Sequence, residues 1–146
     1  PQHVVVGAGT VLTEQDVCAA AKAGATVVIS PNVDVRVVRA TRRRGLVSVP
    51  GVATPTEALT ALEHGACALK AFPGDQLSPK VLKAWRAILP ETACLLAVGG
   101  VSTENMAEYW EAGVSGFGVG TSLFRPGDSI EAVRTKAAAF LAKLPQ

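Results

Sequence analysis

The feature that most constrains the fold is a unit that recurs six times: a short apolar run, a loop of turn-forming residues, and an amphipathic stretch. The apolar runs are too short for helices, are rich in β-branched residues, and are closed by Gly or Pro. Because they are continuously apolar rather than alternating, they favour parallel strands buried on both faces. The predicted strands cover residues 3–6, 26–29, 46–49, 67–72, 94–98 and 116–119.

Helix start and stop signals lie between these runs. Thr54-Pro55-x-Glu57 combines an N-cap residue, Pro at the first helical position and Glu at the third, and Thr13-x-x-Asp16 is a weaker capping box. Asp34, Ser78, Ser102 and Ser129 are expected to open the other helices. Gly24, Gly45, Gly65 and Gly113 suit left-handed positions just past helix ends. The predicted helices cover residues 17–22, 35–44, 80–89, 103–111 and 130–144, with a further one opened by Thr54 and closed at Gly65.

Successive strands begin 20 to 27 residues apart, which is the size of one βα unit. The pattern therefore predicts either a (β/α) barrel or an open, doubly wound sheet. No G-x-G-x-x-G motif follows the first strand, which disfavours a dinucleotide-binding fold. With 146 residues and no linker of low complexity, the chain is expected to form a single domain over residues 1–146.

Composition excludes several classes of protein. With 49% hydrophobic and 18% charged residues the chain is not disordered, and a net charge of +2 gives no basis for a nucleic-acid partner. The five arginines from residue 36 to residue 44 are typical of a solvated helix face. No apolar run approaches the roughly 20 residues of a membrane helix, and no secretion signal opens the sequence. The three cysteines have no metal-ligand spacing, and they indicate buried thiols in a reducing compartment.

Lys70 is the most informative residue because it lies inside a predicted buried strand. An unpaired ammonium is costly there, and burial lowers its pKa. The resulting neutral amine can attack a carbonyl and form a Schiff base. The alternative is a lysine that reaches solvent from a strand end.

Glycines close the last two predicted strands, at Gly99-Gly100 and at Gly118-x-Gly120-Thr121-Ser122. Such glycines let backbone N–H groups approach an anion, or they simply permit tight turns. In eight-stranded barrels phosphate commonly binds after strands 7 and 8. On that count Lys70 stands on strand 6 and the first visible strand is strand 3, so we expect two βα units to precede Pro1.

The remaining candidates are weaker. Thr10, after a Gly-rich turn, suits either carboxylate binding or helix capping. No glutamate stands at a predicted strand end, so the chain shows a nucleophile without an obvious general base.

Five segments of the chain resemble motifs of the class I aldolases that cleave 2-keto-3-deoxy-6-phospho-sugar acids. In order along the chain they are Gly7-Ala8-Gly9-Thr10, Ser30-Pro31-Asn32, Ala68-Leu69-Lys70-Ala71-Phe72-Pro73, Val98-Gly99-Gly100-Val101 and Gly118-Val119-Gly120-Thr121. The resemblance implies a (β/α)8 TIM barrel, of which this chain supplies about the last six βα units. It also implies a cytoplasmic homotrimer that needs no metal or other cofactor.

The resemblance further implies roles for individual residues. Lys70 matches the lysine that bonds the pyruvate keto carbon. Thr10 matches the threonine that holds the pyruvate carboxylate, and Pro31 lines the same pocket. The phosphate end is matched by Gly99, Gly100, Gly120 and Thr121. The family's acid/base glutamate and a substrate-binding arginine belong to the first two βα units, so no position here receives them.

The expected reaction is cleavage of 2-dehydro-3-deoxy-6-phosphogalactonate to pyruvate and D-glyceraldehyde 3-phosphate. Relatives that act on the gluconate epimer typically carry Thr before the Gly-Gly pair, whereas this chain has Val98. Val98 is therefore expected to face the substrate, although a packing role alone is the alternative.

Three other functions are compatible with the sequence: an aldolase for the gluconate epimer, an isomerase or synthase on a phosphate-binding barrel, and a non-catalytic fragment that binds phospho-sugars. Lys70 disfavours the isomerase or synthase, and the absent glutamate keeps the non-catalytic fragment open.

Overall fold

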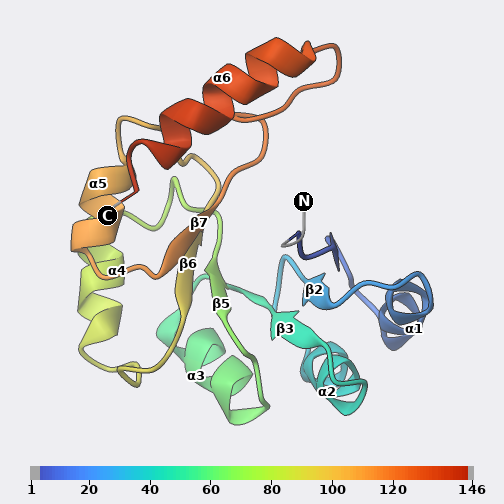
Figure 1. The fold of residues 1–146 in the computed structure, drawn as a ribbon. Helices are drawn as coiled ribbons and strands as arrows, with labels where there is room; N and C mark the ends of the chain where they lie inside the picture. The colour runs from blue at the N-terminus through green and yellow to red at the C-terminus, as the bar shows by residue number, and fades with distance from the viewer. Residues whose placement is uncertain (1–3, 145–146) are drawn as a thin grey trace.

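The computed structural model describes residues 4–144 as an arc of short strands with helices α1 to α5 on its outer side (Figure 1). The strands are β1 (Gly7–Ala8), β2 (Val27–Ile29), β3 (Val47–Val49), β4 (Gly51–Val52), β5 (Leu69–Ala71), β6 (Leu95–Val98) and β7 (Gly116–Gly118). The helices are α1 (Glu14–Lys22), α2 (Val35–Arg43), α3 (Pro55–Glu63), α4 (Pro79–Arg86), α5 (Met106–Glu111) and α6 (Ile130–Leu141). None of the helices in this described part of the chain is long and apolar enough to cross a lipid bilayer.

All strand pairs are parallel, and the strands are ordered β1-β2-β3 in one sheet and β4-β5-β6-β7 in the other. Pro50 separates β3 from β4, and its carbonyl accepts a 2.9 Å hydrogen bond from the Lys70 N–H. The two sheets therefore continue one another. The strand order follows the chain without reversing direction, as in a barrel and unlike a doubly wound sheet.

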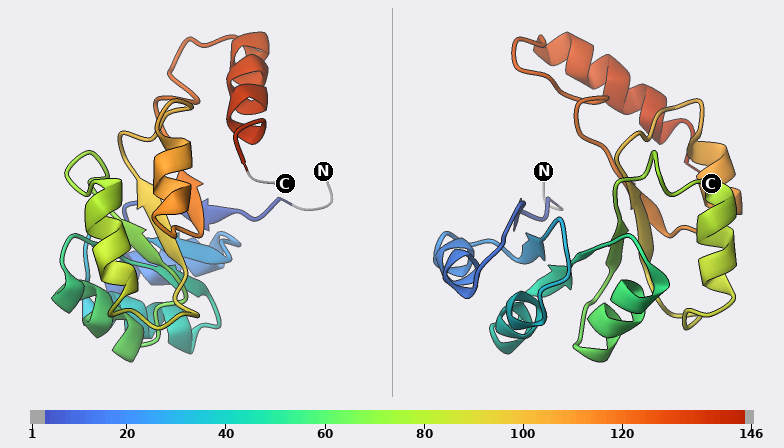
Figure 2. Two further views of the ribbon diagram at one scale, coloured as in Figure 1. Left: turned by 90° about the vertical axis from the view of Figure 1, so that its left-hand side faces the viewer. Right: turned by 180° about the vertical axis from the view of Figure 1, so that it is seen from behind.

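The core lies between the strands and the surrounding helices, which cover the outer side in each view of Figure 2. Leu69 and Ala71 of β5 and Leu95 and Ala97 of β6 point outward and are fully buried. They share one apolar cluster with side chains of α3, α4 and α5. The intervening residues, Lys70 among them, face the inside of the arc and are only half-buried. The prediction of strands buried on both faces was therefore right for the outer face only.

The helix signals are confirmed in most places. Thr13 and Thr54 form complete capping boxes with Asp16 and Glu57, and Asp34 and Ser129 cap α2 and α6 through their side chains. Each predicted stop glycine has a positive φ, between 70° and 94°: Gly24, Gly45, Gly65 and Gly113. Ser78 precedes α4 as expected, but its side chain makes no capping hydrogen bond.

Two strand predictions were wrong. Residues 4–6 form no strand and are exposed, whereas β1 forms at Gly7–Ala8; His3 lies outside the described residues. A side chain at Gly7 would come within 2.9 Å of the Val27 carbonyl oxygen, so the glycine permits this pairing with β2. Gly51–Val52, which lie outside the strand predicted over 46–49, form β4 because the chain resumes pairing beyond Pro50.

Helix α5 begins at Met106 rather than at residue 103, and its N-cap is Asn105 rather than Ser102. The Asn105 side chain accepts a hydrogen bond from the Ser102 N–H (2.9 Å) and donates one to the Gly100 carbonyl (2.8 Å). These bonds hold the preceding residues in a turn. Helices α4 and α6 end at Arg86 and Leu141, three residues before their predicted ends.

Candidate active site

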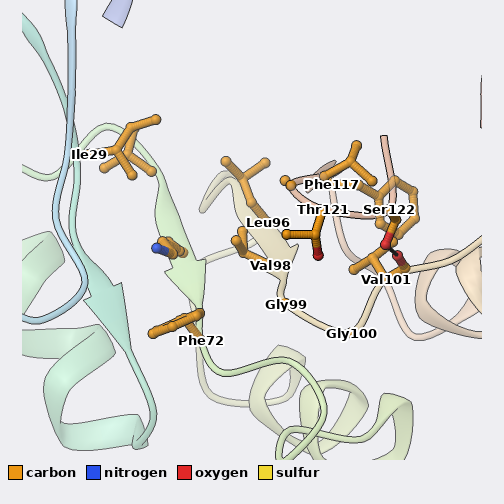
Figure 3. A pocket seen from close by; sticks show the side chains of 15 residues that line it. Ile29, Phe72, Leu96, Val98, Gly99, Gly100, Val101, Phe117, Thr121 and Ser122 are labelled. Atoms are coloured by element: carbon orange, nitrogen blue, oxygen red, sulfur yellow. Dashed lines mark hydrogen bonds between the residues drawn. The ribbon is translucent and has the colours of Figure 1, made fainter. Parts of the chain in front are cut away.

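A cavity of about 460 Å³ opens on the inner side of the arc, where β5, β6 and β7 end. Its lining includes Lys70 and Phe72, the segment from Val98 to Val101, and the segment from Phe117 to Ser122. Ile29, Val49 and Leu96 complete the lining. Figure 3 shows Ile29 and Phe72 at one end of this cavity and Thr121 and Ser122 at the other.

Lys70 is held in the cavity by the alternation of β5. Its neighbours Leu69 and Ala71 are fully buried against the helices, so the lysine side chain must lie on the opposite, inner face. The ammonium nitrogen lies 4.1 Å from the centre of the Phe72 ring, and none of the ion pairs within residues 4–144 includes it. Burial lowers the pKa of Lys70, which enlarges the fraction of neutral, nucleophilic amine at a given pH.

The loop after β6 is built from glycines whose conformations few other residues adopt. Gly99 and Gly100 have φ angles of +91° and +68°. A side chain at Gly74, in the loop after β5, would lie 2.9 Å from the Val98 oxygen and closer still to that of Gly99. The two loops are therefore packed backbone against backbone.

The loop after β7 is more open. Gly120 and Thr121 are exposed at the rim of the cavity, and a side chain at Gly120 would meet no atom within 4 Å. The Ser122 hydroxyl donates a 3.0 Å hydrogen bond to the Val101 carbonyl. This bond ties the β7 loop to the residue that follows the β6 glycines.

Thr10 and Pro31 are not in the cavity lining. Thr10 is exposed, with a φ of +56° that is unusual for a β-branched residue. Its neighbour Val11 is fixed by the buried Ser30, whose hydroxyl donates a 2.7 Å hydrogen bond to the Val11 carbonyl. The Pro31 carbonyl packs so closely on Gly51 that no side chain fits there, and Gly51 pairs with Lys70 in the sheet. Pro31 thus lies one strand away from the lysine.

The cavity lining contains no aspartate, glutamate or histidine, so Lys70 is its single titratable side chain within residues 4–144. Glu57 lies near the end of β4, but its carboxylate accepts hydrogen bonds from the N–H groups of Ala53 (2.7 Å) and Thr54 (3.0 Å). The Glu57 carboxylate is therefore engaged in capping α3. The described site therefore offers a nucleophile without a carboxylate base.

The structure brings together six of the residues singled out from the sequence: Lys70, Val98, Gly99, Gly100, Gly120 and Thr121. Sequence reasoning missed Phe72, Leu96, Ile29 and Val49 as lining residues. Phe72 follows Lys70 by two positions and Leu96 precedes Val98 by two, so the alternation of side chains along β5 and β6 could have identified both. Ile29 and Val49 come from β2 and β3, and the closeness of those strands depends on the curvature of the arc.

Comparison with known proteins decides the family, because residues 1–138 match the family described as KDPG and KHG aldolase. The chain belongs to this aldolase family. It is therefore an aldolase chain, in agreement with the resemblance found in the sequence.

Two relatives and two solved structures show the extent of the likeness. The 2-dehydro-3-deoxy-6-phosphogalactonate aldolase of Escherichia coli (strain K12) is 44% identical over 94% of this chain and 67% of its own length. A relative from Rhizobium meliloti (strain 1021), named for the same activity, is 46% identical over 97% of this chain and 67% of its own. This aldolase chain thus spans about two thirds of these relatives.

A solved structure described as native KDPGal superposes with a TM-score of 0.94 at 44% identity, covering 96% of this chain and 68% of that one. A 4-hydroxy-2-oxoglutarate and deoxyphosphogluconate aldolase superposes with a TM-score of 0.84 at 34% identity, covering 97% of this chain and 70% of that one. The fold is accordingly that of the TIM-barrel-like aldolases, and the chain presents part of it.

Proposed function

We propose that this chain carries the Schiff-base lysine of an aldolase that cleaves 2-dehydro-3-deoxy-6-phosphogalactonate to pyruvate and D-glyceraldehyde 3-phosphate. The observation that carries the proposal is Lys70, a desolvated lysine that is the single titratable group of the described cavity lining. The substrate follows from the relatives that are 44% and 46% identical and bear this activity in their names.

In the proposed mechanism the neutral Lys70 amine attacks the C2 carbonyl carbon to form a carbinolamine, which takes up a proton and loses water to leave an iminium. The C3–C4 bond then breaks. Its electron pair passes through C3 to the iminium nitrogen, and the C4 hydroxyl loses a proton as the aldehyde forms. The enamine is protonated at C3, and water releases pyruvate and restores the amine.

The base that accepts the C4 hydroxyl proton is not among the described cavity residues. We assign it to the family's glutamate, which the resemblance locates in the first two βα units. On this assignment residues 1–146 form one domain with strands three to eight of the barrel. A second candidate, a non-catalytic phospho-sugar-binding chain, is favoured by the same lack of a carboxylate.

The two ends of the substrate are assigned to two ends of the site. Thr10 and Pro31 are assigned to the pyruvate carboxylate; they lie on the loops after β1 and β2, and Pro31 packs on Gly51, which pairs with Lys70. Gly99, Gly100, Gly120 and Thr121 bind the phosphate. These four residues line the cavity on the β6 and β7 loops, where backbone N–H groups approach an anion without hindrance from large side chains.

Val98 is proposed to set the preference between epimers. Its methyl groups line the cavity and pack against Gly118, at 2.7 and 2.9 Å from where a side chain would begin. Valine offers no hydrogen bond to the C4 oxygen, whereas threonine at the same place does. One hydrogen bond is worth about 0.5–1.5 kcal/mol, so Val98→Thr should shift the kcat/KM ratio toward the gluconate epimer several-fold.

The test of Val98 is to measure kcat/KM for both epimers before and after the substitution. Val81→Thr, the same change at an exposed position of α4 outside the cavity lining, is the matched control. If Val98→Thr leaves the ratio unchanged, the assignment of epimer preference to Val98 is wrong. If the native protein strongly prefers the gluconate epimer, the assignment is also wrong and the gluconate-specific alternative is supported.

We also propose that the whole protein is a cytoplasmic homotrimer, as the resemblance implies. Exposed apolar side chains at Phe124, Ile130 and Leu141 offer surface for contacts between copies. A related structure is described as a designed cage made by fusing symmetric oligomeric domains, which is compatible with such assembly. Light scattering on the native protein should give three times the monomer mass, and any other ratio would reject the trimer.

The decisive experiment is covalent trapping. Pyruvate followed by borohydride should label Lys70 and no other lysine, as read by peptide mass mapping. Lys70→Ala should abolish labelling and turnover, while Lys83→Ala, which removes an exposed lysine of α4, should change neither. Labelling elsewhere would remove the Schiff-base role, and labelling at Lys70 without turnover in the native protein would favour the non-catalytic alternative.

A further inference from the structure

Helix α5 carries two side chains that hydrogen-bond to the loops after β5 and β6. Asn105, its N-cap, donates from Nδ2 to the Gly100 carbonyl at 2.8 Å. Tyr109, one turn later, is buried and donates its hydroxyl to the Gly74 carbonyl, also at 2.8 Å. Burial raises the pKa of Tyr109, so the hydroxyl remains a donor at neutral pH. One short helix therefore fixes both loops.

These two loops also fix each other. The Gly74 N–H donates a 2.8 Å hydrogen bond to the Val98 carbonyl, immediately before the Gly99-Gly100 pair. The Phe72 ring lies 3.5 Å from where a side chain on Gly99 would begin. A movement of Gly74 would therefore be transmitted to the glycine loop through backbone contacts.

The glycine loop needs such support because of its composition. Glycine loses more conformational freedom on ordering than any other residue, and two adjacent glycines with positive φ have many alternatives. The Gly100 carbonyl and the Val101 N–H belong to one planar peptide and point in opposite directions. The bond that draws the carbonyl to Asn105 thus also sets the direction of the Val101 N–H, in a residue that lines the cavity.

We propose that Asn105 and Tyr109 are positioning residues that hold the Gly99-Gly100 loop in its phosphate-binding conformation. The inference rests on the proposed function, which assigns the phosphate to this loop. Neither side chain lines the cavity, so each acts through the loop backbone. Because such a loop is already ordered before the phosphate binds, no binding free energy is lost in ordering it.

The test separates the phosphate end of the site from the lysine end. Tyr109→Phe removes one hydroxyl at nearly constant shape, and Asn105→Ala removes the donor to the Gly100 carbonyl together with the acceptor for the Ser102 N–H. Each should raise the Kd of the native protein for glycerol 3-phosphate, measured by calorimetry, by roughly 2- to 10-fold, the effect of one hydrogen bond. Borohydride trapping of pyruvate at Lys70 should keep its native rate. Thr103→Ala, beside α5 but bonded only to Glu104, should change neither quantity.

An unchanged Kd in both variants would overturn the positioning role. So would equal losses of phosphate affinity and pyruvate trapping, since general destabilisation would produce that result. The proposed function fails by a different result, which is the absence of pyruvate trapping in the unsubstituted protein.

Discussion

Gly74→Ala should damage the site and the fold together, because the loops after β5 and β6 leave no room for a methyl group. The new Cβ would lie 2.9 Å from the Val98 oxygen and nearer to that of Gly99, inside the 3.0 Å limit that real Cβ atoms respect. Ordinary contact begins at 3.4 Å, so the Val98 oxygen must retreat by about 0.5 Å and the Gly99 oxygen by more. The obstructing atoms are backbone, which cannot rotate away as a side chain would.

The size of the effect follows from these contacts. Overpacking of this kind costs about 1–3 kcal/mol in the free energy of unfolding. The shift also strains the Gly74 N–H to Val98 carbonyl bond and displaces Gly99. Because a displacement on the order of 1 Å at a binding site can cost roughly 10²-fold, kcat/KM should fall by about 10- to 100-fold.

The assays are urea denaturation for stability and steady-state kinetics for kcat/KM. Gly9→Ala is the matched control, because a side chain there meets no atom within 4 Å and its φ is not positive. That variant should be neutral, or more stable by up to about 1 kcal/mol through the unfolded state. Native stability and native kcat/KM in Gly74→Ala would refute the backbone-packing argument.

Two further predictions follow from Lys70 and from the cap of α3. Since burial lowers the pKa of Lys70, pyruvate trapping should reach half its maximal rate below the ordinary lysine value of about 10.4; a midpoint at or above that value would contradict the desolvation. Thr54→Ala removes the acceptor for the Glu57 N–H and should lower the free energy of unfolding by about 0.5–2 kcal/mol. Thr56→Ala, at an exposed position of the same turn, should be nearly neutral in the same denaturation experiment, and equal losses in the two variants would exclude the cap as the cause.

Local sequence signals correctly predicted those features of the fold that depend on residues close together in the sequence. The capping boxes at Thr13 and Thr54 involve residues three apart, and the stop glycines act through their own φ angles, so both could be read from the sequence. Lys70 could be recognised because a charged side chain inside an apolar run is costly to bury and therefore indicates a function. Gly99 and Gly100 were recognised because they directly follow a predicted strand, where parallel sheets and barrels bind ligands.

Features that depend on distant contacts could not be read in this way. Tyr109 and the Gly74 carbonyl are 35 residues apart, and nothing in either local sequence announces their hydrogen bond. Ser102 carries the usual signal for an N-cap, yet Asn105 takes that place because its amide also reaches Gly100. The continuation of pairing beyond Pro50 likewise depends on β5 lying alongside.

The register of β5 links the packing of the fold to the chemistry of the site. Leu69 pairs with Leu95 and Lys70 with Leu96, so the leucines at 69 and 95 fill the outer core while the lysine faces inward. A slip of one residue would turn Lys70 into the fully buried outer layer and expose Leu69 and Ala71 on the inner face. Burial of an unpaired ammonium in an apolar layer is far costlier than its half-buried place beside Phe72. The apolar residues that stabilise β5 therefore also select the one register in which the amine reaches the cavity with a lowered pKa.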